Sequence, residues 1–248
     1  MFASALGVFV AVGLISIVFV FTLIGIAASV GSTPDYTPKS NTVYKLTLEG
    51  NLSDNTEENP IAMLMGETDK SLSLKDILYS IPPATENKNI KGIYIEAKGL
   101  STGSASLEAI RRALNDFKES GKFIVAYSDN YTQGCYYLCS VADKVFLNPQ
   151  GTLGLVGMAS QTMFYKDLLK KVGVKMMIFK VGTYKGAVEP FMLDKLSDAN
   201  REQIQSYIST IWDNVTNGIA ESRKIPVADI NNFANQGYAF AAAEKAVE

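Results

Sequence analysis

The 248-residue sequence predicts an α/β domain preceded by one apolar N-terminal helix. Three observations indicate this architecture: a charge-free apolar stretch over residues 2–30, an alternation of short strand and helix patterns over residues 90–181, and a long helical pattern after them. Strands that alternate with helices at this spacing favour a largely parallel sheet with helices packed on it.

The N-terminal stretch has the length and composition of a transmembrane anchor. No Asp, Glu, Lys or Arg occurs before Asp35, and residues 2–30 are rich in Val, Ile, Leu, Phe and Ala. At about 1.5 Å per residue, this stretch exceeds the roughly 30 Å hydrocarbon layer. A cleavable signal has an apolar run of only about 7 to 15 residues. We therefore predict an anchor over residues 1–30 and a linker over residues 31–42.

The charges that flank the anchor leave its orientation open. Lys39 and Lys45 follow the span and no basic residue precedes it, which by the positive-inside rule would place the domain in the cytoplasm. A natural anchor usually begins with a few basic residues, however, and this sequence has none there. The charge pattern therefore does not decide on which side of the membrane the domain lies.

The composition excludes several classes of function. The absence of histidine removes Ser-His-Asp and Cys-His catalysis and histidine-ligated metals. Cys135 and Cys139 are the only cysteines, and we expect them to be small buried residues rather than a disulfide or part of a zinc site. The net charge of −2, with scattered signs, argues against a nucleic-acid partner. We expect neither a metal nor a cofactor.

Hydrophobic periodicity predicts the order of the elements after the anchor. Strands are expected over residues 43–48, 90–97, 122–127, 144–147 and 174–181. Helices are expected over residues 73–81, 104–120, 133–142, 164–172 and 198–224, with a short helix from Pro226. Pro82 and Pro83 are expected to end the first of these helices, and Asn148–Gly151 is expected to turn the chain. Because residues 239–248 begin a helical pattern that stops, we expect the chain to be truncated at this end, with a naturally short protein as the alternative.

The segment from Val181 to Phe191 does not fit a plain core pattern. It follows a predicted strand and leads into a helix, where loops of α/β sheets carry function. Lys185 lies there between glycines and apolar residues. A lysine desolvated by apolar neighbours loses its proton more easily, and its neutral amine can then accept a proton from a serine hydroxyl. From the residues alone, a solvated loop lysine is the better interpretation.

Three strings carry a resemblance that changes this interpretation. They are Gly182-Thr183-Tyr184-Lys185-Gly186-Ala187-Val188-Glu189-Pro190-Phe191, the stretch from Tyr136-Tyr137-Leu138 to Asn148-Pro149-Gln150-Gly151, and Leu196-Ser197 before the long helix with Trp212. Together they resemble the signal peptide peptidase A (protease IV) family. More narrowly, residues 43–248 are similar to the amino-terminal repeat of its long, tandem-repeat form.

The resemblance implies a Ser/Lys-dyad serine endopeptidase with a fold related to the Clp protease and crotonase group. In the long form the lysine base lies in the first repeat and the nucleophilic serine in the second. Lys185 matches the lysine. The serine belongs in a Thr-Gly-Ser-Ile-Gly string, and the corresponding stretch here, Thr152–Gly157, has Leu155 at that place. We therefore expect that this half alone is inactive and that the serine-bearing second repeat is missing.

The resemblance also implies where such a protein works and with what. It would be a single-pass protein of the bacterial inner membrane with its catalytic domain on the periplasmic side, where it would degrade cleaved signal peptides left in the bilayer. Expected partners are signal peptides or other hydrophobic peptides, membrane lipid, the second repeat and further copies in a homo-oligomer.

Other candidate residues and functions stay open at this point. The turn Lys98–Ser104 loosely echoes the family's glycine-rich oxyanion turn, although a turn-and-cap role suits it better. Ser101, Ser104 and Ser160 are candidate nucleophiles only if the resemblance misleads, and Glu189 is expected near the positive end of the following helix. One alternative function is a non-catalytic anchored scaffold or peptide-binding module of the same fold, which Leu155 favours. The other is an acyl-thioester enzyme of the crotonase kind, which the anchor disfavours.

Overall fold

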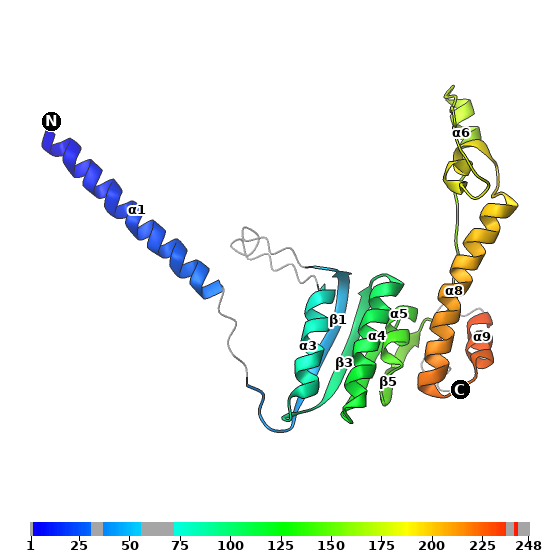
Figure 1. The fold of residues 1–248 in the computed structure, drawn as a ribbon, viewed down its shortest axis with the longest axis horizontal. Coiled ribbons are helices and arrows are strands. Elements are labelled where there is room, and N and C mark those ends of the chain that lie inside the picture. Colours follow the sequence, from blue (N-terminus) through cyan, green and yellow to red (C-terminus); the bar gives the residue numbers. More distant parts are fainter. Residues whose placement is uncertain (1, 31–36, 56–71, 237–240, 243–248) are drawn as a thin grey trace. The chain divides into compact units, whose positions relative to one another are not determined.

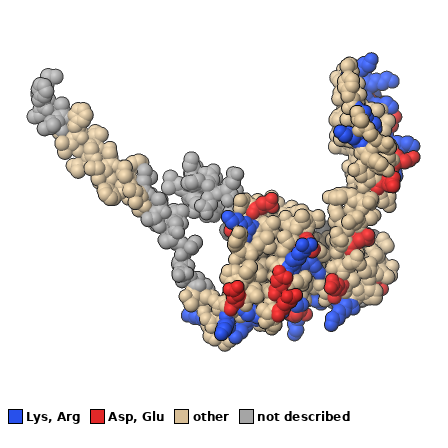
Figure 2. All heavy atoms as spheres, viewed as in Figure 1, with Lys and Arg blue, Asp and Glu red and all other residues tan. Residues whose placement is uncertain are grey.

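The computed structural model of the chain describes residues 2–30, 37–55, 72–236 and 241–242, which fall into two compact units, Met1–Lys39 and Ser40–Glu248. The first unit holds α1, a helix from Phe2 to Val30. Its described side chains are exposed, and Figure 2 shows no charged residue among them. Among the residues whose backbone and side chains are both described, no helix has the length and apolarity that a membrane crossing needs.

The second unit is built on a six-stranded sheet with the order β2-β1-β3-β4-β5-β6. The strands are β1 (Thr42–Ser53), β2 (Leu72–Ser73), β3 (Ile90–Ser101), β4 (Phe123–Tyr131), β5 (Lys144–Leu153) and β6 (Ala241–Ala242). Neighbouring strands are parallel except for β5 and β6, which are antiparallel. The predicted α/β class with a largely parallel sheet is therefore confirmed.

Three helices cover one face of this sheet, and Figure 1 shows them side by side. They are α3 (Leu74–Glu86), α4 (Ser104–Glu119) and α5 (Gln133–Cys139). Alternate residues of β3, including Ile93 and Ile95, are buried under them. The apolar face of α4 packs into the same core, with Ile110 and Leu114 fully buried. Because each fully buried aliphatic side chain contributes about 1.5 to 3 kcal/mol, this layer is the main source of stability.

The rest of the chain contains mostly short helical elements and one long helix. They are α6 (Lys166–Lys171), the 3₁₀ turn η1 (Gly186–Val188), α7 (Glu189–Met192), α8 (Asp198–Arg223) and α9 (Val227–Asn235). Ser197 caps α8, because its hydroxyl accepts a hydrogen bond from the Asn200 amide N–H. Near its other end α8 packs on the core, with Ile219 fully buried.

A buried arginine joins three of these helices. Arg111 of α4 donates hydrogen bonds to the Tyr137 carbonyl and the Ser140 hydroxyl at the end of α5, and to the Gly218 carbonyl and the Ser222 hydroxyl of α8. Its guanidinium also lies 4.6 Å from the centre of the Tyr137 ring. Burial lowers the pKa of the Arg111 guanidinium below its usual range. This side chain therefore fixes the carboxyl-terminal part of α8 to the strand–helix core.

One predicted chain break is wrong, and a second is an irregularity within a strand. The first predicted helix does not end at Pro82 and Pro83 but continues to Glu86, because burial of Ile81 and Ala84 compensates for the hydrogen bonds that the prolines cannot make. The predicted turn Asn148–Gly151 lies inside the bounds of β5, but these residues interrupt its pairing with β4, which jumps from Ser128–Leu147 to Asn130–Thr152. The Asn148 amide donates to Asp129 across this irregularity, and Thr152 bonds to the Asn130 side chain where the pairing resumes.

Two other predicted elements also differ from the structure. Residues 174–181 are not a strand, because no neighbouring strand pairs with them in the described part of the chain. Their alternating pattern leaves Met177, Phe179 and Val181 highly exposed, Phe179 at 90%. Of the predicted C-terminal helix at 239–248, only Ala241–Ala242 lies within the described residues, and it forms β6. The linker prediction falls largely on residues 31–36, outside the described residues.

Candidate functional site

Lys185 lies on an exposed loop between the extended segment 174–181 and α7. Its backbone immediately precedes η1. The side chain is exposed, and within the described residues its amine has no hydrogen-bond or ion-pair partner. The described structure therefore agrees with the solvated loop lysine that the residues alone favour, and the desolvated surroundings that would activate the amine are not found around Lys185 within the described residues.

Four residues downstream, Glu189 is a completely buried carboxylate. It accepts hydrogen bonds from the Ser197 hydroxyl, from the Asn200 side-chain amide at 3.0 Å and from the Ser197 backbone N–H at 3.1 Å. These hydrogen bonds lower the pKa of Glu189 below its usual 4.5. The expected position of Glu189 near the positive end of a following helix is confirmed, and that helix is α8.

A second contact fixes the same loop on α8. A Cβ atom added to Gly186 would lie 2.3 Å from the Asn200 side chain, so the residue after Lys185 packs directly on this asparagine. Only glycine fits there without moving Asn200. Asn200 thus touches the loop at both Gly186 and Glu189, and no pattern in the sequence singles it out.

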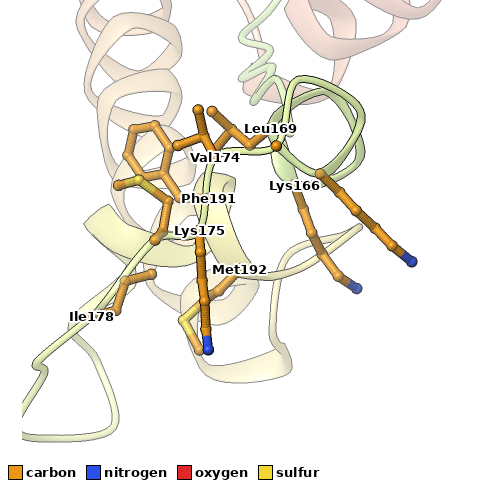
Figure 3. Close-up of a pocket in the computed structure, with 10 residues that line it drawn as sticks. Lys166, Leu169, Val174, Lys175, Ile178, Phe191 and Met192 are labelled. Carbon is orange, nitrogen blue, oxygen red and sulfur yellow. The ribbon is translucent and has the colours of Figure 1, made fainter.

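A cavity of about 430 Å³ lies beside this loop in the chain. Figure 3 shows its apolar wall, to which Leu169, Val174 and Phe191 contribute, and shows the amines of Lys166 and Lys175 pointing away from the Phe191 ring. Phe191 also stacks on Tyr165 at 6.0 Å between ring centres. Lys185 does not line the cavity, which can receive an apolar group and has no hydroxyl or thiol in its described lining.

Hydrocarbon occupies the position at which the resemblance would place a serine. Leu155 follows β5 and is only 4% exposed. The adjacent backbone N–H groups of Val156 and Gly157 both donate to the side-chain oxygen of Gln133, at 3.1 and 3.0 Å. This position therefore has no hydroxyl, and the two amides that follow it already have an acceptor. The sequence offered no sign of the Gln133 contact.

The segment Lys98–Ser104, which was compared with the family's oxyanion turn, makes a structural contact instead. Residues Lys98–Ser101 are the end of β3 rather than a turn, and no side chain in the described chain caps α4 after them. The Leu100 N–H points to the sulfur of Cys135 at 3.3 Å, so this amide already has an acceptor. Cys135 and Cys139 are free and buried as expected, and burial raises the pKa of the Cys139 thiol.

The three alternative nucleophiles do not form a dyad with the candidate base. Ser101, Ser104 and Ser160 are exposed, and none is hydrogen-bonded to Lys185 in the described chain. The described residues also contain no group of three or more acidic or sulfur ligands that could hold a metal. Among the candidate residues that the structure describes, the group that remains for catalysis is the amine of Lys185, on a loop attached to α8.

Comparison with known proteins places this loop in a family context. The profile of peptidase family S49 matches residues 116–248. Protease 4 of Haemophilus influenzae is 33% identical over 215 residues, which is 84% of this chain and 35% of that protein. Protease 4 of Salmonella typhi is 42% identical over 154 residues, which is 62% of this chain and 25% of that protein. The chain therefore spans about a third or less of the length of these two relatives.

More distant relatives agree. A putative signal peptide peptidase SppA of Enterococcus faecium is 23% identical over 194 residues, covering 78% of this chain and 54% of that protein. A solved enoyl-CoA hydratase/isomerase family structure from Silicibacter pomeroyi overlaps with this chain at a TM-score of 0.25 and 10% identity. This similarity is too low to bear on the fold. Kinship with the crotonase group therefore stays a prediction. The profile match and the 33% identity show that the chain belongs to peptidase family S49, the signal peptide peptidase A family of serine peptidases.

Proposed function

We propose that this chain supplies the general base of a Ser/Lys-dyad peptidase, with Lys185 as that base. The neutral amine would take the proton of a serine hydroxyl while the serine oxygen attacks the peptide carbonyl, and the proton would then pass to the leaving amine. Water would release the acyl group in the second half of the reaction. The single observation that carries the proposal is the family motif around Lys185, set on an exposed loop.

The serine in this proposal comes from outside residues 43–248. The buried Leu155 and the engaged amides of Val156 and Gly157 argue against a nucleophile at the matching place in this half. A second repeat or a neighbouring subunit would bring the serine to Lys185. The exposure of the loop supports this arrangement, because docking of another unit would desolvate an amine that solvent now surrounds.

The proposed substrates are cleaved signal peptides or other hydrophobic peptides at a membrane. Support comes from the sequence, since residues 2–30 are apolar and free of charge. The apolar cavity near the loop would suit an apolar side chain of such a peptide. We further propose a single-pass inner-membrane location with the domain in the periplasm, on the analogy of the family alone.

A substitution of the base tests this function. In the natural gene product that carries this chain, Lys185→Ala should lower kcat for a hydrophobic peptide by about 10²- to 10⁴-fold, the usual contribution of a general base. Lys195→Ala removes a nearby exposed lysine and should leave kcat unchanged. Circular dichroism should show that both variants fold. Wild-type activity in Lys185→Ala would contradict the assignment.

A second candidate function is a non-catalytic, membrane-anchored scaffold or peptide-binding module of the same fold. The hydrocarbon at position 155 is the observation that favours it. It predicts that the natural gene product binds hydrophobic peptides without turnover and that Lys185→Ala leaves the binding constant unchanged. Measurable peptide hydrolysis that Lys185→Ala abolishes would exclude this alternative.

A further inference from the structure

We propose that Glu189 and Asn200 are positioning residues, which hold the Lys185 loop on the first turn of α8 and so direct the amine. This inference rests on the proposed function, since it concerns the geometry of the same base. Neither residue touches the Lys185 amine in the described chain. Their effect on catalysis would therefore pass entirely through the backbone of the loop.

The hydrogen bonds explain why the loop adopts this position. The first turn of a helix leaves backbone N–H groups without partners inside the helix, and carboxylates are favoured at that end. Glu189 reaches the cap of α8 from eight residues before Ser197 and accepts three hydrogen bonds there. The Glu189 carboxylate therefore links the start of α7 directly to the N-terminal cap of α8.

Asn200 gives the second point of attachment. Its side-chain amide donates to Glu189, and the same side chain packs against Gly186. Both contacts lie within four residues of Lys185 on its carboxyl side. On the amino side of Lys185, Gly182 has φ +94°. A Cβ atom added to Gly182 would meet nothing within 4 Å among the described residues. The contacts that hold the loop therefore lie on the carboxyl side of Lys185.

Helix α8 in turn connects the loop to the core. Its carboxyl-terminal part is held by the buried Ile219 and by hydrogen bonds from Arg111 to Gly218 and Ser222. One rigid helix of 26 residues thus joins the candidate base to the sheet layer. A general base must come within about 2.6 to 3.2 Å of the group it deprotonates, and an error of about 1 Å can cost about 10²-fold in rate.

The test combines kinetics with hydrogen exchange in the natural gene product. Glu189→Gln removes the negative charge and leaves one acceptor oxygen in place of two opposite three donors, so it should weaken the attachment of the loop to α8. We expect kcat to fall at least about 10-fold with KM within about twofold, because a displaced base slows proton transfer without changing peptide binding. Amide exchange over residues 185–200 should speed up at least about 10-fold, while the exchange of β3 and β4 stays unchanged. Asn200→Ala should show the same pattern more weakly.

The matched control is Asp198→Asn, which removes an exposed carboxylate from the same helix end. It has no hydrogen bond to the loop within the described residues and should keep both kcat and loop exchange at wild-type values. Wild-type kcat in Glu189→Gln would overturn the inference, as would unchanged loop exchange. If Lys185→Ala keeps its activity, the proposed function fails, and the exchange data still decide whether Glu189 holds the loop.

Discussion

At the scale of single residues, the chain separates two tasks within one motif. Lys185 is exposed and carries the proposed chemistry, whereas Glu189 is buried and carries hydrogen bonds to α8. The motif could be found from the sequence because its residues are contiguous. The contact of Gly186 with Asn200 could not, because it depends on the approach of a helix fourteen positions further on, and no local pattern encodes that approach.

Acid should loosen the Lys185 loop through Glu189. The pKa of Glu189 is lower in the folded chain than its usual 4.5, so its stabilising effect is complete above 4.5 and is lost as the pH falls through the lowered folded value. Exchange over residues 186–200 should therefore rise as the pH drops below 4.5, after correction for intrinsic exchange. Glu189→Gln should remove this dependence. A wild-type loop that stays equally protected down to acid unfolding would contradict the account.

Neighbouring arginines on α4 should behave very differently. Arg111 is 5% exposed and makes four hydrogen bonds, so Arg111→Ala should lower the free energy of unfolding by about 2 to 4 kcal/mol. Arg112 is highly exposed and pairs with Glu108 one turn away, so Arg112→Ala should cost less than about 0.5 kcal/mol.

Urea unfolding followed by the fluorescence of Trp212 measures both effects. Trp212 is the only tryptophan, lies on α8 and donates to Asn231 of α9, so its signal reports on the helix that Arg111 holds. Equal stability losses in the two variants would show that Arg111 does not fix α8 to the core.

At the scale of elements, periodicity predicted those helices and strands that bury one face. The pattern of α4 and the strands β3 and β4 are examples, because burial under a neighbouring layer selects their period. Predictions failed where a partner decides the outcome. Pro82 and Pro83 stay within α3 because its buried face continues beyond them, and residues 174–181 form no strand because no strand lies beside them in the described part of the chain.

At the scale of the whole molecule, the described chain contains surfaces that suit further contacts. The exposed side chains of Met177, Phe179 and Val181 lie directly before the Lys185 loop. Exposed apolar groups in such density commonly mark interaction sites. They support the proposal that another unit covers this side and brings the serine.

The central claim is that the nucleophile lies outside residues 43–248 and depends on Lys185. A fluorophosphonate, which reacts covalently with activated serines, tests it most directly when applied to the natural gene product and followed by peptide mapping. The account predicts one labelled serine outside residues 43–248, and no labelling in Lys185→Ala. Labelling of Ser101, Ser104 or Ser160, or undiminished labelling in Lys185→Ala, would contradict it.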